Sequence, residues 1–215
     1  GFPIHTYGVL LAVAFAAALW TAVVLGREAG FSADDISDLA LAALISGLVG
    51  ARILYAAVSW KQFAPMGFGS VWQPNGIILR RDGFVFYGGF LLAVPVTIWL
   101  IHRRKLNFRR VVDVLAPALA LGHAIGRLGC FAQGCCFGGP SRFGLLFPAD
   151  APPSYEFGQV PVHPTQLYES LGLLVLFGVL LSHRTKRRFE GELFALYMIG
   201  YSLLRFLIEC LRADD

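Results

Sequence analysis

The sequence predicts an all-α polytopic membrane protein, and three observations support this fold class. Of the 215 residues, 56% are apolar and only 15% are charged, a more apolar composition than that of ordinary soluble domains. The mean hydropathy is +0.63. Several windows reach or approach the roughly 20 uncharged residues that a helix needs to cross the hydrocarbon core. None of them alternates with a period of two, so strands of a transmembrane barrel are not expected.

Six windows are predicted to form transmembrane helices of one domain over residues 1–215. The first and third windows contain no charged residue, and each of the others contains one or two. The first lacks the basic start and the small-residue cleavage pattern of a signal peptide, so we expect it to be a retained helix. The expected helices are residues 9–26, 39–60, 84–101, 111–131, 166–182 and 193–211.

Two short connections carry most of the basic residues and predict the orientation. Residues 102–110 and 183–188 are rich in Arg and Lys and adjoin helix ends, so the positive-inside rule places both in the cytoplasm. The N-terminus, the C-terminus and the long Gly- and Pro-rich 132–165 loop after the fourth helix then face outside. A loop of that length is often a lid or binding segment. The basic runs are too short to indicate nucleic-acid binding, and no nucleic-acid partner is expected.

Three arginines fall inside apolar windows on different helices: Arg52, Arg127 and Arg205. A buried cation needs a partner. Glu209 lies one helical turn after Arg205, and Glu169 is available from the fifth window, so two carboxylates face three guanidinium groups. The remaining positive charge predicts a pocket for a lipid phosphate, which guanidinium groups bind in a bidentate manner. The alternative is that each arginine reaches toward the interface or only ties helices together.

The four cysteines, Cys130, Cys135, Cys136 and Cys210, map to the side predicted to be outside, where disulfides can persist. A structural disulfide is the leading interpretation, and free buried thiols or a catalytic or redox role are the alternatives. No metal site is expected, because the chain has no CxxC pair and no series of Cys and His ligands. No cofactor is expected either.

Two motifs resemble the prolipoprotein diacylglyceryl transferases. Residues 126–138 read GRLGCFAQGCCFG and residues 163–169 read HPTQLYE, similar to the family signature GRxGNFxNG followed by HP(S/T)QLYE. Further matches occur in the family's order, namely YG at 7–8, GAR at 50–52, FYGG at 86–89 and GYSLLRFLIECLR at 200–212. The family usually carries a further C-terminal helix, so we expect either a truncated chain or a short member of the family, and in both cases one that diverges at its cysteines.

The resemblance implies an enzyme of the bacterial inner membrane with its active site toward the periplasmic leaflet. Family members move a diacylglyceryl group from phosphatidylglycerol to the thiol of a lipobox cysteine and release glycerol phosphate. By match to the motifs, Arg127 and Arg205 would neutralise that phosphate. The other motif positions expected to bind substrate are Tyr7, Arg52, Gln133, Gly138, His163, Gln166, Tyr168, Glu169, Tyr201 and Glu209.

The acid–base residue and the acceptor are open at this stage. Tyr87 occupies the place of a family histidine, and a phenol with a pKa near 10 is a poor base at neutral pH. His123 and His163 are possible substitutes, and the alternative for each is a structural hydrogen-bonding role. Tyr87 and His123 are the catalytic candidates. A lipoprotein cysteine is the family's acceptor, but another nucleophile is an alternative.

Two other function classes remain. One is a thiol–disulfide or acyl-transfer enzyme that uses Cys130, Cys135 or Cys136, and the other is a non-catalytic phospholipid-binding protein. The transferase interpretation predicts turnover after conservative cysteine replacement, whereas a thiol enzyme would lose it.

Overall fold

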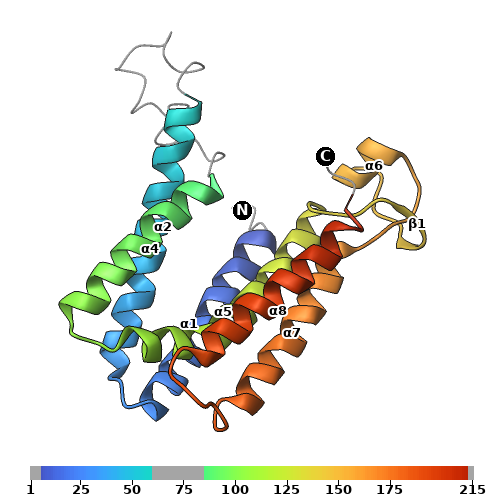
Figure 1. Ribbon diagram of the computed structural model, residues 1–215. Helices are drawn as coiled ribbons and strands as arrows, with labels where there is room; N and C mark the ends of the chain where they lie inside the picture. Colours follow the sequence, from blue (N-terminus) through green and yellow to red (C-terminus); the bar gives the residue numbers. More distant parts are fainter. Residues whose placement is uncertain (1–5, 60–84, 213–215) are drawn as a thin grey trace, which may run out of the picture. The chain divides into compact units, whose positions relative to one another are not determined.

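The computed structural model describes residues 6–59 and 85–212 (Figure 1). The chain folds into two compact units. One unit comprises residues 1–31 and 109–215, and the other comprises residues 32–108.

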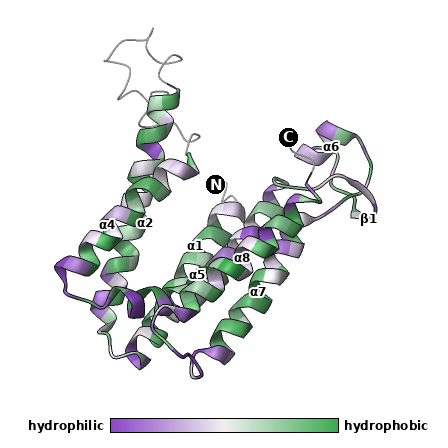
Figure 2. Cartoon of the chain, viewed as in Figure 1, coloured by the Kyte–Doolittle hydropathy of each residue, from purple (hydrophilic) through white to green (hydrophobic). Residues whose placement is uncertain are grey.

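Within the described residues, long helices form at all six predicted windows. They are α1 (Thr6–Glu28), α2 (Ala33–Val58), α4 (Phe86–Arg103), α5 (Phe108–Gln133), α7 (Thr165–His183) and α8 (Glu192–Glu209). Four of them, α1, α2, α5 and α7, are long and apolar enough to cross a membrane, and α4 is apolar but shorter. Figure 2 shows hydrophobic residues along the helices and hydrophilic residues near many of their ends. The chain is thus a helical membrane protein, and six membrane crossings and their orientation stay predictions.

The smaller unit is a pair of helices, α2 and α4, that approach closely at glycines. A Cβ on Gly50 would overlap the carbonyl of Gly88, and a Cβ on Gly88 would overlap the carbonyl of Gly50. Small residues at such positions let membrane helices pack backbone against backbone. Outside the bilayer region, Arg104 donates to Asp35 at 2.7 Å and also to Asp38. Part of the basic 102–110 run therefore ties the two helices together.

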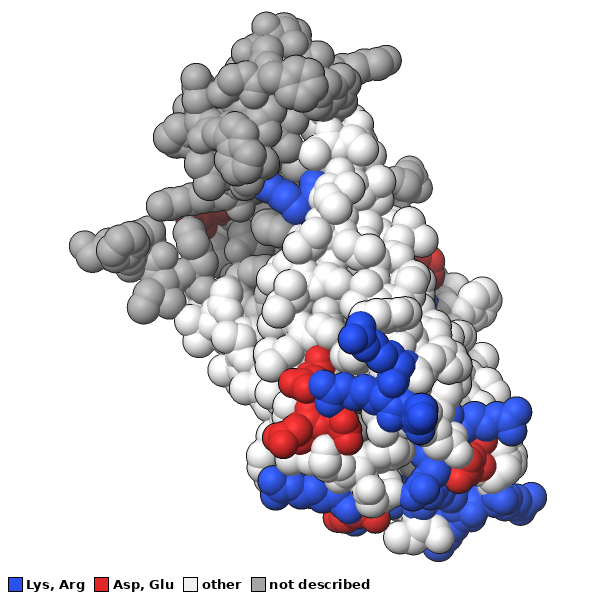
Figure 3. Space-filling model, turned by 90° about the vertical axis from the view of Figure 1, so that its left-hand side faces the viewer, with Lys and Arg blue, Asp and Glu red and all other residues white. Residues whose placement is uncertain are grey.

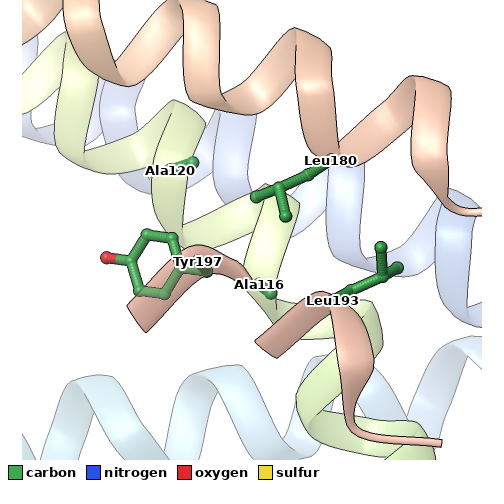
Figure 4. Close-up of a cluster of buried hydrophobic side chains, with 5 residues drawn as sticks. All are labelled: Ala116, Ala120, Leu180, Leu193 and Tyr197. Carbon is green, nitrogen blue, oxygen red and sulfur yellow. The ribbon is translucent and has the colours of Figure 1, made fainter. Parts of the chain in front are cut away.

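The larger unit contains α1, α5, α7 and α8, which run alongside one another in Figure 1. Small residues of α5 make room for larger side chains of α7 and α8. Figure 4 shows this buried cluster, which consists of Ala116, Ala120, Leu180, Leu193 and Tyr197. Alanines of α5 thus face leucines and a tyrosine of α7 and α8.

Asp113 of α5 connects the start of α8 to α5. Gly191, at the N-cap of α8, has no side chain that could cap the helix. Instead the Asp113 carboxylate accepts hydrogen bonds from the N–H groups of Gly191 at 2.8 Å and Phe194 at 3.1 Å. Arg187 of the second basic run donates to the same carboxylate at 3.4 Å. A carboxylate at this position satisfies otherwise unpaired N–H groups and complements the helix dipole.

The 132–165 loop is folded. It contains β1 (Pro140–Leu145) and the short helix α6 (Pro152–Phe157), and Val162 pairs with both ends of β1. The N–H of Gly138 donates to the carbonyl of His163 at 2.8 Å, and the N–H of Gly139 donates to the carbonyl of Leu211 at 3.0 Å. The loop is thus fixed against both the start of α7 and the end of α8.

Charged side chains are unevenly distributed on the surface. Much of the described surface in Figure 3 is uncharged, and the Lys, Arg, Asp and Glu side chains gather mainly toward the lower end of that view. This distribution suits helices whose middle parts face lipid.

The close approach of α2 and α4 yields a first prediction. Gly50→Ala should destabilise this helix pair by about 1–3 kcal/mol, because the new methyl group meets the Gly88 backbone. Gly47→Ala is the matched control on the same helix, since a Cβ there would lie 3.8 Å from its nearest neighbour, Ala93. Thermal unfolding in detergent should show a lower midpoint for G50A only. Equal midpoints for the two variants would contradict the close glycine contact.

Candidate functional site

A buried carboxylate, Glu169, lies at the centre of the candidate site. It is 2% exposed and sits near the start of α7. Its Oε1 atom is 2.9 Å from Arg127 Nη2, and its Oε2 atom is 3.8 Å from Arg205 Nη1. The Tyr201 hydroxyl donates to Oε1 at 3.3 Å, and His123 Nε2 lies 3.7 Å from the same atom.

Helical spacing explains why these side chains meet. His123 and Arg127 are four residues apart on α5, and Tyr201 and Arg205 are four residues apart on α8. Residues at this spacing share one helix face. The two faces converge on Glu169 of α7, and the rings of His123 and Tyr201 meet edge to face with centroids 4.9 Å apart. The site therefore joins three helices.

Each of the two arginines has a buried N–H group without a hydrogen-bond acceptor among the described residues. Arg205 pairs with Glu209 at 2.5 Å as well as approaching Glu169. Even so, the buried nitrogen atoms Arg127 Nε and Arg205 Nη1 make no hydrogen bond to any residue within the described ranges. Buried N–H groups on guanidinium ions favour an oxyanion partner. The arrangement can thus bind a phosphate beside the Glu169 carboxylate.

Tyr7 packs against the same end of α5. A Cβ at Gly129 would lie 3.3 Å from the Tyr7 ring, so the absence of a side chain at Gly129 allows α1 to approach. Tyr7 is 39% exposed. Its ring is available to a ligand, in line with the predicted role in lipid binding, which stays a prediction.

The structure places several predicted substrate-binding residues in the framework of the loop. Gln166, 1% exposed, donates from Nε2 to the carbonyl of Cys135 at 2.6 Å. His163 Nδ1 lies 3.4 Å from the Tyr168 hydroxyl. At Gly138 a Cβ would overlap the Leu211 carbonyl and crowd His163. These residues hold the loop in place, and direct contact with a substrate stays a prediction for each.

Gln133 lines a separate cavity at the end of α5. This cavity has a volume of about 710 Å³ and is bounded by the α5 terminus, the end of β1 and α6. Gly134 and Tyr155 are also part of its wall. The cavity gives the folded loop room for a ligand of moderate size.

Two predicted site residues belong to the other unit. The Arg52 guanidinium lies 5.4 Å from the centre of the Tyr55 ring, a cation–π contact on α2. Tyr87 is 72% exposed at the start of α4. Convergence of Arg52 with the Arg127 and Arg205 pair, and a catalytic role for Tyr87, stay predictions.

All four cysteines are free thiols, so the disulfide expected from the sequence is not formed in this structure. The Sγ atoms of Cys130, Cys135 and Cys136 nevertheless lie within 4.8 Å of one another. The sequence argument against a metal site rested on motif spacing, and it missed this convergence. The Cys135 thiol donates to the carbonyl of Cys130 at 3.6 Å. Cys210 is exposed, and its thiol donates to the Phe206 carbonyl.

Sequence reasoning missed two hydroxyl groups that position the site. Thr165 Oγ1 donates to the carbonyl of Cys136 at 2.7 Å, and Ser170 Oγ donates to the carbonyl of Ala124 at 2.9 Å. Both residues are at least nine-tenths buried. Both residues lie close to Glu169 in the sequence, at the start of an apolar window. A hydroxyl buried there needs a hydrogen-bond partner, and this could have indicated their role.

The fold and the site together define a helical membrane protein with a buried carboxylate between two arginines. The family model described as prolipoprotein diacylglyceryl transferase matches residues 1–215. The phosphatidylglycerol–prolipoprotein diacylglyceryl transferase 2 of Clostridium perfringens (strain 13 / Type A) is 32% identical over 218 residues, covering 100% of this chain and 81% of the relative. The phosphatidylglycerol–prolipoprotein diacylglyceryl transferase of Finegoldia magna is 34% identical over 216 residues, covering 100% and 82%.

A third relative, the phosphatidylglycerol–prolipoprotein diacylglyceryl transferase of Bacillus cereus (strain G9842), is 34% identical over 219 residues, covering 100% of this chain and 78% of the relative. The chain belongs to the prolipoprotein diacylglyceryl transferase family, as its motifs predicted. It is therefore a member of a transferase enzyme family.

The central carboxylate yields a second prediction. Glu169→Gln should destabilise the protein by roughly 3–5 kcal/mol, because it leaves the largely buried Arg127 without its counter-charge and Arg205 with Glu209 alone. Glu209→Gln is the matched control, since Glu209 also pairs with Arg205 but is 54% exposed, and an exposed pair contributes about 0–1 kcal/mol. Thermal unfolding in detergent should show a much larger decrease for E169Q. Similar decreases for both variants would show that Glu169 is not the centre of the cluster.

Proposed function

We propose that this chain transfers a diacylglyceryl group from phosphatidylglycerol to the thiol of a lipoprotein cysteine. Family membership and the names of the relatives support the reaction class. The observation that carries the proposal is the pair of arginines from α5 and α8, each with a buried N–H group that makes no hydrogen bond within the described ranges. These donors suit the phosphate of the lipid head group.

In the proposed reaction, the acceptor sulfur attacks the glyceryl carbon that carries the phosphate. A C–S bond forms, the C–O bond to phosphate breaks, and glycerol phosphate leaves with the bonding electron pair. Negative charge grows on the phosphate as the bond breaks, so Arg127 and Arg205 stabilise the transition state more than the bound lipid. Glu169 holds both guanidinium groups in place and limits their net charge before the lipid binds.

The acceptor thiol must lose its proton, and we assign that proton to His123. Among the described residues of the larger unit, His123 lies beside the arginines, with Nε2 3.7 Å from Glu169 and its ring against Tyr201. A neutral imidazole accepts a proton near neutral pH, whereas a phenol with an ordinary pKa does not. Tyr87 is the alternative base.

We place the reaction in the periplasmic leaflet of the bacterial inner membrane. Glu169 lies near the start of α7, and the basic run 183–188 follows the end of that helix. If the basic run lies in the cytoplasm, as the positive-inside rule predicts, the arginine pair lies in the outer half of the membrane.

A third prediction tests the arginine pair. Arg127→Ala and Arg205→Ala should each lower kcat/KM by about 100-fold or more, because each removes a donor to the departing phosphate. Arg184→Ala is the matched control: Arg184 also pairs with a glutamate, Glu28, at 3.2 Å, but lies just beyond the other end of α7. Purified protein, labelled phosphatidylglycerol and a lipobox peptide would be incubated, and the lipidated peptide and glycerol phosphate measured by mass spectrometry.

Near-normal turnover in folded R127A and R205A would refute the arginine role. Lipid binding by the unsubstituted protein without release of glycerol phosphate would refute transfer and indicate a phospholipid-binding protein. The R184A control separates the loss of one phosphate donor from the loss of any arginine–glutamate pair.

A fourth prediction tests the base. His123→Gln should lower kcat by about 100-fold or more. In the unsubstituted enzyme the rate should rise with pH as the imidazole loses its proton, and this rise should be absent in H123Q. His183→Gln is the matched control, because His183 pairs with Glu192 at 2.8 Å at the opposite end of the bundle. If H123Q keeps the pH profile while Tyr87→Phe loses it, the base is Tyr87.

A further inference from the structure

Three thiols come together where α5 ends. Cys130 belongs to the last turn of α5, and Cys135 and Cys136 follow the helix. Their three Sγ atoms lie within 4.8 Å of one another, and all three residues are half-buried. Proximity of three soft sulfur atoms from two segments distinguishes this cluster from a single buried cysteine.

The backbone turn that creates this cluster is held by buried donors. Gly134 and Cys136 have φ values of +71° and +60°, and the second is unusual for a residue with a side chain. The Cys135 N–H donates to the Cys130 carbonyl at 3.1 Å. Thr165 and Gln166, each 1% exposed, donate to the carbonyls of Cys136 and Cys135. The two segments are therefore fixed before any ligand arrives, which reduces the entropy cost of binding.

The separation of the sulfur atoms suits a metal ion. Zinc–sulfur bonds of about 2.3 Å in a tetrahedral site place ligand sulfur atoms about 3.8 Å apart. Side chains whose sulfur atoms already lie within 4.8 Å of one another reach that spacing by small rotations about χ1. Thiolate sulfur is a soft ligand that selects zinc and Cu(I) over the hard cations.

We propose that Cys130, Cys135 and Cys136 form a binding site for a thiophilic d¹⁰ metal ion, Zn²⁺ or Cu(I). Binding forms three sulfur–metal bonds and releases the thiol protons that are still present. No electron is transferred, so the step needs no oxidant or reductant. With Zn²⁺ a fourth position remains for water, and with Cu(I) three sulfur atoms complete a trigonal site. The ion would clamp the end of α5 to the turn that follows it.

The proposal goes beyond the transferase function, and its test measures metal binding rather than turnover. The reduced, metal-free 215-residue protein in detergent would be titrated with Co²⁺, followed by Zn²⁺ displacement. Thiolate coordination produces near-ultraviolet sulfur-to-cobalt absorption bands. A separate arm would measure Cu(I) retention against a chromogenic Cu(I) chelator. We expect about one ion per chain in at least one arm, and the arm that succeeds identifies the metal.

Single serine variants test the ligands. C130S, C135S and C136S should each weaken binding by about tenfold or more, since each removes one of three sulfur bonds. C210S is the matched control, because Cys210 is exposed and outside the cluster, and it should bind like the unsubstituted protein. Circular dichroism would confirm that each metal-free variant is folded.

A measurement on the unsubstituted protein does not depend on any variant. With metal bound, iodoacetamide should modify Cys210 alone, and after chelation it should modify all four cysteines, as counted by mass spectrometry. Absence of both the cobalt bands and Cu(I) retention would overturn the proposal. So would equal weakening by C210S, or equal labelling of the three cluster cysteines with and without metal. Transferase activity has no part in these readouts, so either proposal can fail alone.

Discussion

The ion cluster around Glu169 is the interaction on which the arrangement of the larger unit depends. A carboxylate that is 2% exposed would be too costly to bury alone, and so would the guanidinium groups that face it. Together they remove most of each other's charge and join α5, α7 and α8 at one level. Hydrogen bonding within the cluster is incomplete, because one N–H group on each arginine lacks an acceptor among the described residues. The same three side chains thus join the helices and form the proposed phosphate site.

A second buried carboxylate, Asp113, holds the opposite end of α5 and α8. It caps α8 through two backbone N–H groups and also receives Arg187. Asp113 links α5 directly to the start of α8, and Glu169 of α7 links Arg127 of α5 to Arg205 of α8, so α5 and α8 are connected at two levels. Apolar packing between them, with Ala116 and Ala120 against Tyr197, is less directional. The register of the helices therefore follows from the two carboxylates.

The helices and the arginine pair could be predicted from the sequence because their signals are local. Apolar windows located the six long helices, and the i, i+4 relation of Arg205 to Glu209 predicted their ion pair correctly. Glu169 was also identified as an available partner for a buried arginine, but its pairing with Arg127 was not predicted. The capping role of Asp113 and the thiol cluster were not predictable in this way. The capping depends on the start of α8, which returns to α5 from a distant part of the chain. The thiol cluster depends on a local turn with a positive φ at Cys136, which donors from the start of α7 hold in place.

The cysteine cluster and one member of the arginine pair, Arg127, share helix α5, and this limits how each can act. Cys130 lies three residues after Arg127, nearly one turn along α5, so anything that fixes the sulfur atom also restricts the last turns of that helix. Gln166 and Thr165 hold the cysteine turn, and Glu169 follows them within the first turns of α7. The start of α7 therefore contacts both sites through a rigid helix. One helix therefore links the proposed oxyanion site to the proposed site for a soft cation.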